Sequence, residues 1–242
     1  MDKPAFHRGR DRARLQLAAV ALAGGCLVAA APSAAQVAPS AVEAASYDGL
    51  HAAAHDGRSD LVAKLLAGGA APDVRDGHGR TPLHVATFGR HHAVMQMLAK
   101  AGADLGALEN DRYDAVTIAA VADDEATLRL LLSLGASARL VTSRYDGTAL
   151  IAAAHLGHDG VVRQLIAAGA PLDHVNNLHW TAVIESIVLG GGGPRHRATL
   201  AALIEAGADL QLADRSGRTP LALARERGYG EMVTMLEKAG AR

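Results

Sequence analysis

The feature that most constrains the fold is an internal repeat with a period of about 33 residues. Two sets of equivalent positions recur along the chain, one occupied by Leu or Val and one by Gly. The first set is Leu50, Leu83, Val116, Leu150, Val183 and Leu221, and the second is Gly69, Gly102, Gly135, Gly169, Gly207 and Gly240. Successive members are 33 or 34 residues apart, except for one spacing of 38 in each set. A unit of this length cannot bury an apolar face by itself, so we predict an array stabilised by the stacking of neighbouring units.

The stretch 76–103 shows how the local structure of one unit follows from its sequence. Asp76 and Gly79 are turn-forming residues. Thr81-Pro82 indicates a helix start, with Thr as the N-cap and Pro at the first helical position. The second helix has the i, i+3, i+4 apolar spacing of one buried face, and the recurring glycine follows it as a left-handed C-cap. We therefore predict an all-α chain of six helix-turn-helix units joined by β-turn fingers.

The segment Thr81-Pro82-Leu83-His84, at a period near 33 residues, resembles the T-P-L-H motif of the ankyrin repeat. The resemblance implies one ankyrin-repeat solenoid over residues 46–242. Its six repeats are expected at about 46–75, 76–108, 109–141, 142–173, 174–210 and 211–242.

Several repeats depart from the family pattern. In repeat one, Asp48-Gly49 replaces Thr-Pro, as expected for a terminal unit with one free face. Repeat three replaces the G-x-T-P-L segment at residues 112–116 but keeps its apolar positions, so we expect its fold to be kept and its surface to be altered. Repeat five contains five extra residues, for which we predict a mobile loop at Gly190–Pro194. Drift in a tolerant loop and contact with a partner both explain this insertion. Glu237 replaces an apolar residue of the last helix and predicts the C-terminal cap of the array.

The first 35 residues have the composition of a secretory signal. Four arginines precede an uncharged apolar run over residues 15–31, and Ser33 and Ala35 provide the small residues of a cleavage site. We predict that residues 1–35 are a cleavable signal peptide and that 36–45 form a short lead to the repeats. Export to the periplasm is the expected localisation.

Two alternatives remain open for this segment. Seventeen apolar residues are close to the lower limit for a membrane span, which leaves an uncleaved anchor possible. Ala23-Gly24-Gly25-Cys26 is a poor lipobox, but it leaves open a lipoprotein acylated at Cys26. Cys26 is the only cysteine, so a chain cleaved after Ala35 has none and suits an oxidising compartment. Residues 1–35 carry a net charge of +3, which leaves −4 of the total of −1 for the rest and argues against general nucleic-acid binding.

In the ankyrin family, the finger tips and the exposed ends of the first helices line a concave face that binds protein partners. The resemblance carries this role to His55, His78, Arg80, Phe88, Tyr113, Arg144, Tyr145, His155, Asn177 and Trp180. Four of the seven aromatic residues of the chain belong to this set. Tyr, Trp and Arg are also the residues enriched at interface hot spots. For Trp180, packing between fingers is the alternative role.

Metal, cofactor and catalytic sites are not expected. His51 and His84 occupy the motif position where the ankyrin family uses the ring to hydrogen-bond the turn. His155 and His158 are three residues apart, but Gly157 between them ends the first helix, and the chain has no H-E-x-x-H pattern. It also lacks a G-x-S-x-G motif and a P-loop. We therefore predict no enzymatic activity.

These observations favour a monomeric, non-catalytic scaffold that binds a partner protein through the concave face. One alternative is an accessory or protective factor for an exported enzyme, in which histidines handle haem or a metal. Another is a secreted effector that binds a host protein. We expect no nucleic-acid partner and no membrane association apart from export.

Overall fold

The computed structural model describes residues 37–242, so the predicted signal peptide lies outside the described residues. In this part of the chain, a short helix α1 (Ala41–Ala45) is followed by six pairs of helices. The pairs are α2 (Gly49–His55) and α3 (Ser59–Ala67), α4 (Pro82–Phe88) and α5 (His92–Lys100), α6 (Ala115–Val121) and α7 (Glu125–Ser133), α8 (Ala149–Leu156) and α9 (Asp159–Ala167), α10 (Ala182–Val188) and α11 (Pro194–Glu205), and α12 (Pro220–Glu226) and α13 (Gly230–Lys238). The predicted solenoid of six helical pairs is confirmed.

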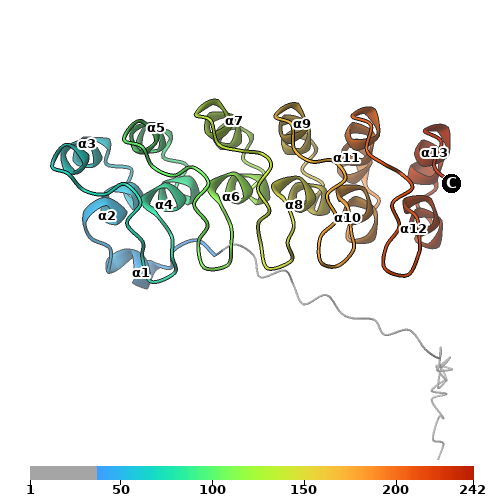
Figure 1. Ribbon diagram of the computed structural model, residues 1–242, viewed down its shortest axis with the longest axis horizontal. Coiled ribbons are helices and arrows are strands. Elements are labelled where there is room, and N and C mark those ends of the chain that lie inside the picture. Colours follow the sequence, from blue (N-terminus) through green and yellow to red (C-terminus); the bar gives the residue numbers. More distant parts are fainter. Residues whose placement is uncertain (1–36) are drawn as a thin grey trace, which may run out of the picture. The chain divides into compact units, whose positions relative to one another are not determined.

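The pairs stack side by side in chain order and form two layers (Figure 1). The first helices of the pairs form one layer and the second helices form the other, and the fingers project from the layer of first helices. No β-strand is present in residues 37–242, where one isolated bridge joins Thr142 and Gly147 inside the fourth finger. None of the helices described is both long and apolar enough to cross a membrane.

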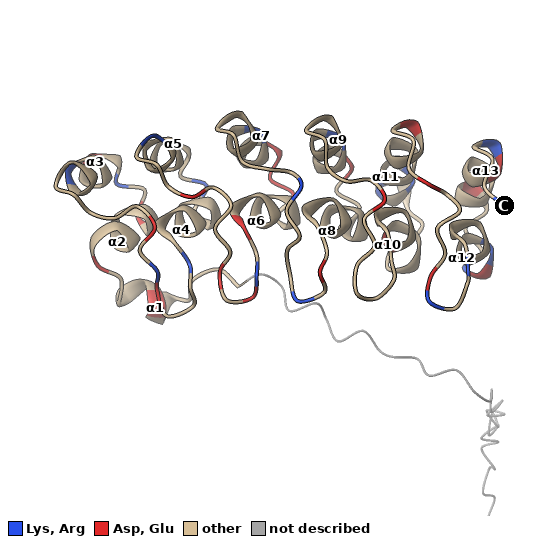
Figure 2. Ribbon diagram, in the orientation of Figure 1, with Lys and Arg blue, Asp and Glu red and all other residues tan. Residues whose placement is uncertain are grey.

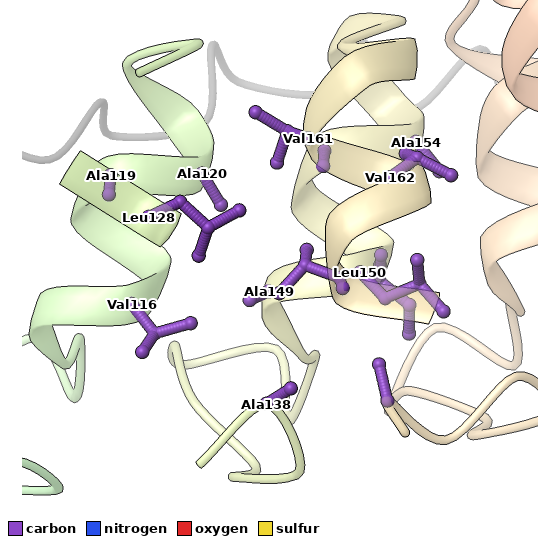
Figure 3. Packing of buried hydrophobic residues seen from close by; sticks show 14 of the residues in the cluster. Val116, Ala119, Ala120, Leu128, Ala138, Ala149, Leu150, Ala154, Val161 and Val162 are labelled. Atoms are coloured by element: carbon purple, nitrogen blue, oxygen red, sulfur yellow. The ribbon is translucent and has the colours of Figure 1, made fainter. Parts of the chain in front are cut away.

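The apolar core runs along the whole array, between neighbouring pairs and between the two layers. Leu128, Leu150 and Leu165 are completely buried, and the core continues through many alanines and valines. Figure 3 shows this packing around repeats three and four, where Leu128 and Leu150 are labelled. Burying one leucine side chain contributes roughly 1.5–3 kcal/mol relative to leaving it exposed. The stability of each repeat therefore depends on its neighbours, as the short period predicts.

The capping residues predicted from the sequence begin and end the helices. Thr181 accepts a hydrogen bond from the backbone N–H of Ile184 at 3.3 Å and caps α10. Thr81 caps α4, and its own N–H donates to His84 Nδ1 at 3.0 Å. After the second helix of repeat two, Gly102 has φ 84°, a left-handed conformation that glycine adopts without strain. The local sequence therefore determines where these helices begin and end.

The fingers are joined to one another by backbone hydrogen bonds between their tips. The N–H of Asn110 donates to His78 O at 3.0 Å, and the N–H of Asn177 donates to Tyr145 O at 2.9 Å. Between them, the N–H of Ser143 donates to the carbonyl of Arg112 at 2.8 Å. We call these bonds the finger ladder. They fix the spacing of the tips along the array.

The insertion in repeat five is held more firmly than the predicted mobile loop. Three of the five extra residues lengthen α11 to 12 residues, compared with nine in α5, and the other two lie in the connection over residues 189–193. The hydroxyl of Tyr229, in repeat six, donates to Gly190 O at 2.9 Å. The Tyr229 ring lies so close to Gly192 that a Cβ on this glycine would clash with it. The loop is thus packed against the next repeat.

The two ends of the array differ in the contacts that their polar residues make. Asp48 begins α2 without a side-chain capping bond, which fits the atypical first repeat. At the other end, the Glu237 side chain is half-exposed and pairs with Arg225 at 2.6 Å. Partial exposure and the pair with Arg225 accommodate the charge at this position, and its role as the C-terminal cap stays a prediction.

Candidate protein-binding face

The ten predicted partner-binding residues lie on the fingers and at the ends of first helices, a surface we call the finger face. The structure divides them into two groups. One group lies over repeats two and three and contains His78, Arg80, Phe88 and Tyr113, which line a cavity of about 250 Å³. The other lies over repeats four and five and contains Arg144, Tyr145, His155, Asn177 and Trp180. His55, on repeat one, is exposed and contacts Asp56 at 2.9 Å.

Arg80 is not the exposed anchor that we expected, because only 3% of its side chain is accessible. Its Nε donates to Asp76 at 2.7 Å, and its Nη2 donates to Glu43 at 2.8 Å. Burial alone would lower the pKa of Arg80, but the hydrogen bonds to these two carboxylates raise it overall. Arg80 is buried because the lead segment folds back over it, which the repeat pattern does not reveal.

Tyr113 is also buried, with 9% of its surface exposed, so it offers little area to a partner. Its carbonyl accepts a hydrogen bond from His84 Nε2 at 3.1 Å, and its N–H donates to Glu109 Oε1 at 3.0 Å. These contacts give Tyr113 a role inside the finger. Phe88, at the end of α4, keeps part of its side chain accessible beside the cavity.

In the second group, the polar residues hold neighbouring fingers together. Arg144 pairs with Asp111 of the preceding finger at 2.5 Å, and Asn177 Nδ2 donates to Arg144 O at 3.0 Å. These bonds reinforce the finger ladder. Trp180 is half-buried and packs against the core, while part of the ring stays accessible.

The sequence reasoning missed Glu185, a buried carboxyl on α10 behind this group. Its side chain is 5% exposed, and its Oε1 accepts a hydrogen bond from Asn176 Nδ2 at 3.0 Å. Its Oε2 has no hydrogen-bond partner, although His155 Nδ1 lies 3.5 Å away. Burial raises the pKa of Glu185 to about 7, a shift that the bond from Asn176 opposes. The sequence does mark Glu185 as unusual, because apolar residues fill the same position in the other repeats. These residues are Ala52, Val85, Ile118, Ala152 and Leu223.

Several of the described histidines link neighbouring repeats. His84 Nδ1 accepts from the turn at Thr81, as predicted, and His51 Nε2 contacts the next finger at Arg80 O, 2.9 Å away. His91 and His196 likewise contact carbonyl groups at the ends of first helices in the preceding repeats. Among residues 37–242, no group of three or more His, Cys, Asp or Glu side chains is placed to hold a metal ion.

Charges of both signs are mixed on the fingers, except on the fifth, which carries none (Figure 2). Ion pairs between fingers account for part of this pattern, such as Arg144 with Asp111 and Arg112 with Asp146 at 3.3 Å. The finger face thus has no single-sign stripe of the kind that binds nucleic acid. Its surface is suited to a partner that combines apolar and polar contacts.

Comparison with known proteins identifies the fold. A family model described as Ankyrin repeats (3 copies) matches residues 50–142, 116–214 and 151–242. The putative ankyrin repeat protein YahD of Escherichia coli (strain K12) is 35% identical over 190 residues, which cover 78% of this chain and 94% of YahD.

Solved structures agree with this match. An ankyrin repeat domain from Acinetobacter baumannii AYE superposes with a TM-score of 0.76 at 43% identity, over 80% of this chain and 98% of that one. The ankyrin repeat domain of Bcl-3, a member of the IkappaB protein family, gives a TM-score of 0.72 at 27% identity, over 81% and 88% of the two chains. The family match across the repeats and the six stacked helical pairs show that this chain belongs to the ankyrin-repeat family.

Proposed function

We propose that the protein is a non-catalytic scaffold that binds a partner protein through the finger face over repeats three to five. Ankyrin repeats are generally protein–protein interaction modules, and proteins built from them are typically not catalytic. The observation that carries the proposal for this chain is the finger ladder. It holds the finger tips in place before a partner arrives, so little conformational entropy is lost on binding.

Apolar side chains along this part of the finger face provide contact area. Leu178, at the tip of the fifth finger, and Leu156, at the end of α8, are each 40% exposed. Tyr145 and Trp180 lie on the same fingers and keep part of their rings accessible. Partly exposed apolar and aromatic groups on a rigid support are typical of the central residues of protein interfaces.

The proposal can be tested with the full-length chain carrying a C-terminal tag, crosslinked in living cells and then purified. We compare the wild type with a double variant, Tyr145→Ala and Leu178→Ala, which removes accessible groups without touching the buried core. The control is Arg129→Ala on α7, in the other helix layer, where the side chain is 69% exposed. Capture of one partner by the wild type and the control, but not by the double variant, would support the proposal. Equal capture by all three would exclude this surface.

We also propose that the protein is exported to the periplasm and that its signal peptide is removed after Ala35. The arginines, the apolar run and the small residues of the first 35 positions support this. Cell fractionation with N-terminal sequencing tests it, and a periplasmic chain that begins at Gln36 is the expected result. An intact membrane-bound chain or one acylated at Cys26 would contradict it, and a chain found only in the medium would favour the effector alternative.

The same periplasmic preparation allows two further checks. Elution as a single species at the mass of one chain on size-exclusion chromatography is expected for a monomeric scaffold. A spectral change on adding haem or a divalent metal would instead favour the accessory-factor alternative.

A further inference from the structure

The lead segment, of which the structure describes residues 37–45, lies on the finger face without being part of the core. Helix α1 contributes no buried residue, and Val37 and Val42 are 70% and 82% exposed. An end cap of a solenoid would cover the first repeat with apolar side chains. The lead contacts repeat two through the carboxylate of Glu43 and the carbonyl of Val37.

These contacts converge on one carboxylate, that of Glu43. Its Oε1 accepts a hydrogen bond from Arg80 Nη2 at 2.8 Å and lies 2.5 Å from His78 Nε2. Arg80 Nη1 also donates to Val37 O at 3.4 Å. Ser40 orients the carboxylate through a capping box, in which its N–H donates to Glu43 Oε2 at 2.7 Å. Hydrogen bonds from Ser40, and then from Arg80, lower the pKa of Glu43 to about 2, so it is ionised at neutral pH.

Repeat six shows the same finger motif without a lead segment. Both fingers have the pattern Asp-x-x-Gly-Arg, at residues 76–80 and 214–218. Arg218 directs both Nε and Nη2 to Asp214 Oδ2, and its side chain is 44% exposed. In repeat two, the hydroxyl of Tyr47 donates to the corresponding oxygen, Asp76 Oδ2, at 2.7 Å.

The difference between the two fingers explains how the carboxylate site arises. Because Tyr47 shares Asp76 Oδ2 with Arg80 Nε, the outer nitrogens of Arg80 point away from Asp76. Arg80 Nη2 and His78 Nε2 are then both available to one carboxylate oxygen. This arrangement is a built site for a carboxylate, and the lead segment supplies the one that fills it.

Space remains on both sides of this contact. A cavity of about 380 Å³ reaches from it toward Tyr47 and His51, and the cavity of about 250 Å³ reaches toward Phe88 and Ile118. Glu43, His78 and Arg80 belong to the walls of both cavities. The lead therefore fills the carboxylate site but leaves room beside it for bulkier side chains.

We propose that His78 and Arg80 form a binding site for an acidic side chain of a partner protein, and that the lead segment occupies this site as a tethered competitor. The partner segment has the chemistry of the lead, a glutamate presented at the start of a helix, with larger neighbouring side chains that enter the two cavities. This inference rests on the proposed function only in taking the partner to be a protein.

The test uses the full-length chain and a fluorescent peptide with the sequence of residues 36–46. A tethered segment acts at an effective concentration near the millimolar range, so it competes strongly with the free peptide. In the Glu43→Gln chain this competitor is weakened, and we expect the peptide to bind at least about 10-fold more tightly than to the wild type. The matched control chain is Val42→Thr, which changes an exposed neighbour and should behave as the wild type.

The peptide also provides a control that does not affect folding. A peptide with Gln in place of its Glu should bind the Glu43→Gln chain at least about 10-fold more weakly, since it lacks the charge that pairs with Arg80. Equal affinity of the two peptides, equal affinity of the wild-type and Glu43→Gln chains, or no binding in NMR titrations at millimolar peptide would each overturn the proposal. The readout does not involve Tyr145 or Leu178, so failure of the proposed scaffold function would be seen separately.

Discussion

Replacing Glu185 with glutamine is expected to stabilise the protein at alkaline pH and to remove part of its pH dependence. Burial raises the pKa of Glu185 from 4.5 to about 7. The carboxyl thus holds its proton more tightly in the folded chain than in the unfolded one. Its contribution to the free energy of unfolding is fully present below about pH 4.5, decreases as the pH rises, and is lost above about pH 7.

The size of this effect follows from the two pKa values. They differ by about 2.5, and each unit corresponds to about 1.36 kcal/mol, so the full change is about 3 kcal/mol. A glutamine side chain keeps an oxygen for Asn176 Nδ2 and has no charge to bury. It also offers an N–H to His155, whose pKa is lowered by burial and by the nearby His196 and His158, a shift that favours the neutral ring able to accept this bond.

Urea unfolding followed by circular dichroism, at about pH 5 and about pH 8, measures this difference, most of which falls between these two values. Comparing variants removes the contribution of every other titrating group. The control Glu205→Gln changes an exposed glutamate of α11 and should follow the wild type. If Glu185→Gln loses as much stability between the two pH values as the wild type, the carboxyl titrates normally in the folded chain and the reasoning is wrong.

Three further predictions follow from other contacts. Thr181→Ala removes the N-cap of α10 and should lower the free energy of unfolding by about 1 kcal/mol, whereas Thr181→Ser should retain most of it in the same denaturation assay. Tyr229→Phe deletes the bond to Gly190 O and should lower the free energy of unfolding by about 1 kcal/mol. Amide hydrogen exchange should become faster in residues 189–193 only. Unchanged exchange would show that packing of the ring alone holds the loop. Burial, opposed by the bond to Tyr113 O, lowers the pKa of His84 to about 4. The contribution of neutral His84 is therefore present above about pH 6.5 and lost as the pH falls toward about 4, which NMR titration of its ring can check.

Most of the fold could be predicted because the same local sequence pattern recurs in six repeats. Each threonine cap and each left-handed glycine acts within its own repeat, so short-range rules locate the helices. The insertion in repeat five was harder, because its structure depends on Tyr229, which belongs to the next repeat and lies 39 residues from Gly190.

The exposure of a candidate site residue could be predicted only where it follows from the position of that residue in the repeat. Arg80 lies at an exposed family position, yet Glu43, 37 residues earlier, covers it. A lead segment has no repeat to align with, so its docking could not be inferred from periodicity. Tyr113 lies in the altered finger of repeat three, and its burial was likewise not predicted. Glu185 shows the opposite case, since a carboxyl at an apolar repeat position was visible in the sequence.

The finger ladder also sets how far a local disturbance travels along the molecule. Each bond in it joins a finger tip only to the adjacent one, such as Asn110 to His78 and Asn177 to Tyr145. A structural change at the third finger is therefore passed to the second and fourth and weakens with each further step. Distant parts of the finger face can then change in sequence, or engage different ligands, independently of one another.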